Sequence, residues 1–286
     1  MARDRIALLD WPTGFGSPAR KPVVYFAIPF FSLAAIFFAV ELVRAISAAD
    51  ALSIVFHAGG MAVSAGFVAA FTAARNVRQA SLPPKLKVTE TGTGRALTMP
   101  MSRPFTISLL TLLVSGTVFL LAYALSLFLR DDRSGAAQLR DYLFGVVLIV
   151  TSAVMVWLAV YHVTNLRRES PLVISSEGIE MDNGSVHQRL PWTAIETVDA
   201  SANNNNPALI IRPSASDELH TFRSSVIVRK LSRNYLRAMI IDVHFYRIDP
   251  ALLYHLIHFY WKHPELRSEL STNTVIDRLR RGNLSI

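Results

Sequence analysis

The sequence predicts an α-helical membrane protein with four transmembrane helices in two hairpins, followed by a small, mainly-β domain that a C-terminal helix closes. Three observations lead to this fold class. Four apolar segments are each at least about 20 residues long, which matches a hydrocarbon core about 30 Å thick. From Pro171 onward, short β-prone runs alternate with turn signals. Near the end of the chain the pattern changes to that of an amphipathic helix.

Composition agrees with membrane spans. Of the 286 residues, 51% are hydrophobic and only 17% are charged, against about 25% charged residues in an average soluble domain. Residues 1–165 carry a net charge of +6 and residues 166–286 one of +2. The excess charge therefore lies beside the apolar segments, and we expect no nucleic-acid partner. The absence of cysteine excludes disulfides, thiolate metal sites and a cysteine nucleophile.

We expect a transmembrane region over residues 22–164, after an N-terminal cytoplasmic segment over residues 1–21. Its predicted spans cover about 22–43, 51–74, 104–129 and 142–164. The first span is too long for a signal-peptide core and lacks a clear cleavage site, so it is interpreted as a retained helix.

The charged flanks predict the orientation of the spans. The loop over residues 75–103 holds six basic residues and a single acid, Glu90, whereas basic and acidic residues balance between the third and fourth spans. By the positive-inside rule the N-terminus, the 75–103 loop and the C-terminus are cytoplasmic. The predicted location is the plasma (inner) membrane, crossed four times.

The chain contains a short internal repeat. Residues 76–81 and 165–170 both follow the pattern N-x-R-x-x-S, and each comes after a predicted helical hairpin and before proline and a β-like run. Duplicated hairpins explain the match. Chance similarity of two basic segments beside the membrane explains it equally well, so both alternatives stay open.

Residues 165–286 form the predicted β-rich domain. Asp182-Asn183-Gly184 favours a hairpin turn because Asn and Gly tolerate positive φ. The run Arg237–Tyr246 alternates apolar and polar residues and predicts a half-buried strand. The other expected strands are Leu172–Ser175, Ile179–Met181, His187–Leu190, Ile195–Val198, Ala208–Arg212 and Val226–Val228, with a loop at Asn203–Asn206.

A helix is predicted after the last of these strands. Asp249 supplies an N-cap and Pro250 the first helical residue. An apolar stripe follows at spacings of three and four: Leu252, Leu253, Leu256, Phe259 and Tyr260. Pro264 ends this helix or starts the next, and Thr274–Arg281 predicts a short, frayed, basic tail helix.

The residues from Pro171 to Lys262 resemble a bacterial pleckstrin-homology-like domain. The resemblance rests on Leu172-Val173-Ile174 with Gly178-Ile179, and on Leu190-Pro191-Trp192-Thr193-Ala194-Ile195-Glu196-Thr197-Val198. It implies a small barrel or curved sheet with a helix at one end. It implies no catalytic residue, because such modules usually bind lipids, peptides or proteins. The first hairpin loop, Asp182–Ser185, lacks the basic cluster of a phosphoinositide binder.

Within the membrane, Gly60 and Ser64, like Ala62 and Gly66, have the small-xxx-small spacing that lets helices approach closely. We expect them to pack within the bundle or against a partner, although small residues are common in membrane helices. Ionisable residues in spans are functional candidates by default, which draws attention to Glu41, His57 and His162. Glu41 and His162 lie near span ends, where structural roles are expected.

Basic residues at the predicted cytoplasmic surface are candidates for binding anionic lipid headgroups, each worth about 1 kcal/mol there. A role in orienting the membrane helices is sufficient to explain why these basic residues are present, so both roles stay open. The candidates are Arg75, Arg78, Lys85, Lys87, Arg167 and Arg168.

No catalytic residue, metal site or cofactor is predicted. His255 and His258 share a helix with His263 close by, but no further ligands are spaced to complete a metal site. The chain has no phosphate-binding loop, dinucleotide fingerprint, G-x-S-x-G or H-E-x-x-H motif.

The leading hypothesis is a non-enzymatic, membrane-anchored binding or scaffold protein. Its β-rich domain would engage a protein, peptide or lipid at the inner leaflet, with anionic lipids and a membrane protein or second copy of the chain as partners. One alternative is a small transporter or an accessory subunit of one, which needs a polar pathway around His57. A lipid-modifying membrane enzyme is the other, and it needs acids or histidines converging at one interface.

Overall fold

The computed structural model divides the chain into a β-rich unit and a helical unit. The β-rich unit comprises Met1–Arg20, Asn76–Ser102 and Arg168–Ile286, and the helical unit comprises Lys21–Arg75 and Arg103–Arg167. The structure describes residues 6–17, 22–74, 78–83, 86–92, 94–99, 103–129, 135–166, 171–182, 186–203, 206–215, 218–224, 237–246 and 248–284.

The helical unit contains four helices that are long and apolar enough to cross a membrane. They are α1 (Pro22–Ser47), α2 (Ala51–Ala74), α3 (Arg103–Phe128) and α4 (Ala136–Leu166). Each contains one of the predicted spans to within a residue at either end, so the prediction of four long apolar helices is confirmed. Asp50 begins α2 as its N-cap, because its carboxylate accepts hydrogen bonds from the backbone N–H groups of Leu52 and Ser53.

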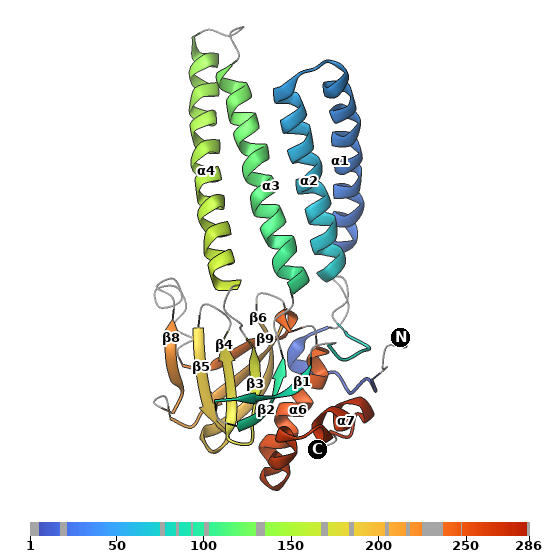
Figure 1. The fold of residues 1–286 in the computed structure, drawn as a ribbon, viewed down its shortest axis with the longest axis vertical. Coiled ribbons are helices and arrows are strands. Elements are labelled where there is room, and N and C mark those ends of the chain that lie inside the picture. Colours follow the sequence, from blue (N-terminus) through green and yellow to red (C-terminus); the bar gives the residue numbers. More distant parts are fainter. Residues whose placement is uncertain are drawn as a thin grey trace. The chain divides into compact units, whose positions relative to one another are not determined.

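The four helices pack in chain order, α1 on α2, α2 on α3 and α3 on α4 (Figure 1). Much of each helix surface stays open as a result. In α1, only 6% of the most apolar stretch is buried inside the structure. An open apolar surface of this extent is what lipid or a membrane partner covers.

The larger sheet of the β-rich unit has six strands in the order β1-β2-β3-β4-β5-β8, and each neighbouring pair is antiparallel. The strands are β1 (Lys87–Thr91), β2 (Gly94–Met99), β3 (Leu172–Ile174), β4 (Gly178–Asp182), β5 (Val186–Pro191) and β8 (His220–Ser224). The expected Asp182–Gly184 turn extends beyond the described residues, and Val226–Val228 lies outside them.

Two of these strands come from the segment that the sequence assigned to a basic loop, residues 75–103. In the structure β1 and β2 form a hairpin, and β2 pairs with β3 through Leu97 and Ile174. Leu97 and Met99 are fully buried. The connection between the second and third spans therefore contains a hairpin, of which the sequence indicated only a β-like run, because the burial that stabilises it comes from strands more than 70 residues away in the chain.

The smaller sheet contains β6 (Ile195–Asn203), β7 (Asn206–Pro213) and β9 (Met239–Asp242) in the order β6-β7-β9. The strand expected at Arg237–Tyr246 is shorter than predicted, since a 3-10 helix, η4 (Val243–Phe245), follows Asp242. Its alternation also fails, because Met239, Ile240 and Ile241 are all buried.

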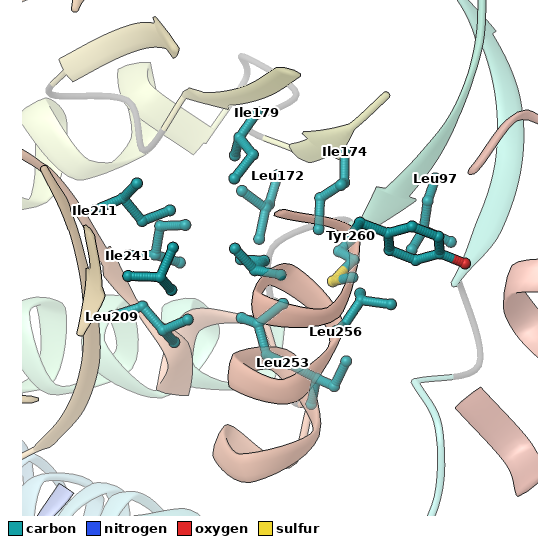
Figure 2. Close-up of a cluster of buried hydrophobic side chains, with 14 of the residues drawn as sticks. Leu97, Leu172, Ile174, Ile179, Leu209, Ile211, Ile241, Leu253, Leu256 and Tyr260 are labelled. Atoms are coloured by element: carbon teal, nitrogen blue, oxygen red, sulfur yellow. The ribbon is translucent and has the colours of Figure 1, made fainter. Parts of the chain in front are cut away.

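The apolar core lies between the two sheets and α6 (Pro250–Lys262), as Figure 2 shows. Leu209, Ile211 and Ile241 enter it from the smaller sheet, and Leu97, Leu172, Ile174 and Ile179 from the larger one. The predicted stripe of α6 is confirmed: Leu252, Leu253, Leu256, Phe259 and Tyr260 are all at most 6% exposed.

Two further elements follow α6. A 3-10 helix, η5 (Pro264–Ser271), starts at Pro264, and α7 (Thr274–Arg281) occupies the predicted tail helix. The tail is not frayed, because Val275 and Leu279 are fully buried. The structure thus has the predicted coarse organisation: four apolar helices and a β-rich C-terminal region with a C-terminal helix.

Candidate functional site

Two of the six residues proposed for headgroup binding are described, Arg78 and Lys87. The other four, Arg75, Lys85, Arg167 and Arg168, lie outside the described side chains. Lys87 is exposed at the first position of β1, which is an edge strand. A lysine there is available to a charged surface, and it also discourages pairing with another strand.

The second described residue, Arg78, is part of a buried polar junction. Its Nε lies 3.2 Å from Oδ2 of Asp249, a carboxylate that is only 1% exposed. Its second terminal nitrogen donates to the carbonyl of Leu9 at 2.7 Å. The guanidinium also lies 5.4 Å from the centroid of the Trp11 ring. The charge of Arg78 is therefore committed to contacts within the β-rich unit.

Asp249 has a second role in the same junction. Its carboxylate accepts hydrogen bonds from the backbone N–H of Leu252, as the cap of α6, and from that of Gln79. The N-cap was predicted from the sequence, but its partner Arg78, 171 residues away, was not. Through these bonds the junction joins the N-terminal segment, the chain after α2 and the start of α6.

The N-terminal segment, residues 6–17, packs on the β-rich unit. Phe15 is 4% exposed, and its ring lies 6.2 Å from that of Tyr254. Gly14 is pressed against β6, since a Cβ at this position would lie 2.0 Å from the carbonyl oxygen of Ala200. Only glycine permits this approach, so the segment's register on β6 is fixed.

A cavity of about 360 Å³ opens between this segment, β6 and α6. It is lined by Asp10, Trp11, Pro12, Thr13, Gly14, Val198, Asp199, Ala200, Tyr254 and His255. Nε2 of His255 lies 3.0 Å from the carbonyl of Asp10 and holds that wall in place. Burial and the charge of Asp199 raise the pKa of the Tyr254 phenol. No local sequence pattern indicated this cavity, because its walls come from three distant segments.

The small residues predicted for helix packing lie on α2. A Cβ at Gly60 would lie 2.6 Å from the Phe38 ring of α1, and one at Gly66 would lie 2.8 Å from Leu112 of α3. Ser64 is 4% exposed, and Ala62 is half-buried. The two glycines thus face neighbouring helices of the same chain.

Two of the ionisable membrane residues, Glu41 and His57, make different contacts. Glu41 forms an ion pair with Arg44, three residues along α1, at 2.6 Å. The ring of His57 lies among aromatic rings, 5.1 Å from Phe56 and 6.1 Å from Phe38. Its buried Nδ1 has no hydrogen-bond partner among the described residues. The described surroundings of His57 are thus mainly aromatic rings, together with an electrostatic interaction with Asp50, the N-cap of α2.

The histidines of α6 serve different contacts. The ring of His258 lies 5.3 Å from that of Trp261, and burial lowers its pKa. His263 pairs with Glu265 at 3.1 Å. In the described part of the chain, no three His, Cys, Asp or Glu side chains gather as metal ligands would.

An ionic cluster outside the predicted set closes the C-terminal region. Glu269 binds two nitrogens of Arg278, at 2.8 Å each, and accepts a hydrogen bond from the hydroxyl of Tyr260 at 3.0 Å. The bond from Arg278 is the main reason that the pKa of Glu269 is lowered. This cluster ties η5 and α7 to α6.

Comparison of the chain with protein-family models found no matching family. Searches of curated proteins and of solved structures likewise found no match.

Proposed function

We propose that the chain is a non-enzymatic, membrane-anchored binding or scaffold protein whose β-rich domain works at the inner leaflet. One observation carries this proposal. The β-rich unit is built from three parts of the chain that alternate with two helical hairpins. A fold of this kind makes the domain an integral part of the membrane protein rather than an appendage on a linker.

The same observation supports the proposed orientation. Ile6 donates a backbone hydrogen bond to Ala80, Arg78 binds Asp249, and β2 pairs with β3. Segments that share one core must lie on one side of the membrane. Their basic flanks favour the cytoplasmic side.

The resemblance to a pleckstrin-homology-like module supports binding rather than catalysis. In its favour are two antiparallel sheets followed by an amphipathic helix. Trp192, from the segment that carries the resemblance, is 2% exposed, and its Nε1 donates to the carbonyl of Ser175. On this proposal the domain binds a protein, a peptide or a lipid, and the basic residues beside the helices hold anionic headgroups.

The headgroup proposal can be tested with the full-length protein in nanodiscs. We would replace Lys85, Arg167 and Arg168 by Gln together, leaving Arg78 intact because it holds Asp249. At about 1 kcal/mol per charge, three substitutions should weaken the binding of anionic lipid about 100-fold. Native mass spectrometry across a titration of anionic lipid into neutral lipid gives the measurement.

The matched control replaces three exposed arginines elsewhere, Arg95, Arg280 and Arg281, by Gln, and so removes the same total charge. This control should retain most of its bound anionic lipid. Equal losses in the two variants would mean that only net charge matters. Headgroup binding by the residues beside the helices would then be wrong.

A further inference from the structure

The cavity beside the N-terminal segment has the chemistry of a cation site. Two carboxylates, Asp10 and Asp199, and two aromatic side chains, Trp11 and Tyr254, line it. Carboxylates accept charge-assisted hydrogen bonds from ammonium and guanidinium groups, and aromatic faces attract the same cations. The Trp11 ring already has the Arg78 guanidinium 5.4 Å from its centroid, so Tyr254 supplies the aromatic face for a ligand. The carboxylates repel phosphate, so anionic lipid headgroups do not suit this site.

Two residues that line the cavity carry hydrogen-bonding groups that the described chain does not use. Asp10 is exposed and its carboxylate forms no ion pair with any described residue, while the Tyr254 hydroxyl has no hydrogen-bond partner within the described chain. Asp199 is different, because Arg212 pairs with it from outside the lining. Asp10 therefore supplies the principal free charge, and Asp199 adds acceptor capacity.

The walls are fixed before any ligand arrives. Nε1 of Trp11 donates to the carbonyl of Gly16 at 2.7 Å, and the Trp11 ring lies 5.2 Å from that of Phe15. The contact of Gly14 with Ala200 and the bond of His255 to Asp10 hold the two sides together. A preformed site loses little conformational freedom on binding, which favours affinity for a small group.

The size of the cavity restricts the ligand. About 360 Å³ is near the lower end of the roughly 300–1,000 Å³ typical of small-molecule sites. It accommodates a single long side chain or a small amine but not a nucleotide. We propose that this cavity binds an organic cation that carries a guanidinium or primary ammonium group. The source of that group is a basic side chain of a partner peptide or a free amine.

The test uses the full-length protein in nanodiscs of neutral lipid, with isothermal titration of three probes. The first is acetyl-Gly-Arg-Gly-amide, the second is the same peptide with citrulline in place of arginine, and the third is agmatine. Citrulline keeps the shape of arginine without its charge. The arginine peptide should bind saturably at one site per chain, and the citrulline peptide at least about tenfold more weakly, because one charge-assisted contact is lost.

Asp10→Asn should weaken binding of the arginine peptide by a similar factor, whereas the matched control Asp277→Asn, at an exposed acid of α7, should leave it unchanged. Tyr254→Phe should weaken binding less than Asp10→Asn. Unchanged thermal unfolding of the Asp10→Asn protein shows that the site, rather than the fold, was altered.

The probes also separate the two sources. Tighter binding of the peptide than of agmatine identifies a protein side chain as the source, and the reverse identifies a free amine. The proposal is overturned if no probe saturates, if the citrulline and arginine peptides bind equally, or if Asp10→Asn binds as the wild type does. None of these outcomes bears on the headgroup residues, which are tested separately.

Discussion

In the β-rich unit, apolar side chains such as Leu209 and Leu253 are fully buried, whereas in the helical unit Phe37 and Trp157 are more than half exposed. The polar contacts differ as well. In the β-rich unit Arg78 binds Asp249, 171 residues away in the chain, but Ser115 of α3 donates to the carbonyl of Thr111 in its own helix.

This difference is the one expected when water surrounds one unit and lipid surrounds the other. In water, burying apolar surface drives folding, and distant segments are tied together by polar contacts around one core. In lipid, helices gain nothing by hiding apolar side chains from one another, so their association rests on close packing at small residues. Gly59 illustrates this, since a Cβ there would lie 3.1 Å from the backbone of Phe119 in α3.

The sharpest test of the comparison is Asp249→Ala. This change removes the cap of α6 and leaves the Arg78 guanidinium without its buried partner, so the β-rich unit should lose about 3–5 kcal/mol of stability. Denaturant-dependent proteolysis of the full-length protein would measure the loss. Asp277→Ala serves as the control, because that carboxylate is exposed and, among the described residues, pairs with Arg280 of the same helix. If both variants resist protease equally, the junction does not hold the unit together.

A matched pair of phenylalanines tests the two solvents directly. Phe37, in the middle of α1, is 58% exposed, and Phe222, on β8, is 63% exposed. A lysine at the centre of a membrane helix costs about 2.5–3.5 kcal/mol of insertion free energy. Phe37→Lys should therefore reduce the fraction of chains inserted, as measured by alkaline extraction of membranes.

Phe222→Lys should insert normally and cost the β-rich unit no more than about 0.5–1.5 kcal/mol, because the Phe222 ring contacts only that of His187 among the described rings, at 4.9 Å between centroids. Normal insertion of Phe37→Lys would instead mean that this face of α1 meets a polar partner or water. Exposure to lipid would then not explain the difference between the two units.

The sequence also predicted the helical unit better than the β-rich unit. The existence of the four apolar helices was predicted, because a membrane demands a long apolar run that local composition reveals. The ends of α2 and α3 agree within one residue, but α1 continues to Ser47 and α4 already begins at Ala136. The α6 helix was equally accessible, since Asp249-Pro250 and the following stripe are local signals. By contrast, only the start of β1 was foreseen, as the β-like run after residues 76–81, and β2 was not, because its segment is rich in charged and hydroxyl residues and its pairing depends on Leu172–Ile174.

The candidate site was harder to predict than the fold. Arg78 has the same sequence context as other basic residues beside membrane helices, so nothing local distinguished it as the partner of Asp249. The cation cavity needs Asp10, Asp199 and Tyr254 together, and no periodicity or motif connects them. Gly14, between Thr13 and Phe15, is the one lining residue whose type suggests a close backbone contact. The residue that it contacts, Ala200, is far away in the sequence.

The smallest expected effect concerns acid stability and the cluster of Glu269, Arg278 and Tyr260. The pKa of Glu269 is lowered from its ordinary value of 4.5, chiefly by the hydrogen bond from Arg278. A lowered folded-state pKa contributes stability above pH 4.5, and that stability is lost as the pH falls toward the lowered value, because the unfolded chain takes up the proton first. Glu269→Gln should cost about 1.5–3 kcal/mol at pH 7, the usual contribution of hydrogen bonds to charged groups.

The diagnostic feature is the pH profile. The wild type and Glu269→Gln should converge in stability as the pH falls below 4.5, because protonation removes from the wild type the charge that the variant already lacks. Glu196→Gln, at an exposed position of β6, should follow the wild-type profile throughout. If the difference in unfolding free energy between wild type and Glu269→Gln were the same at every pH, the contact would depend on the shape of the side chain and not on its charge. The polar contacts of the β-rich unit would then depend on shape, as the packing contacts between the helices do.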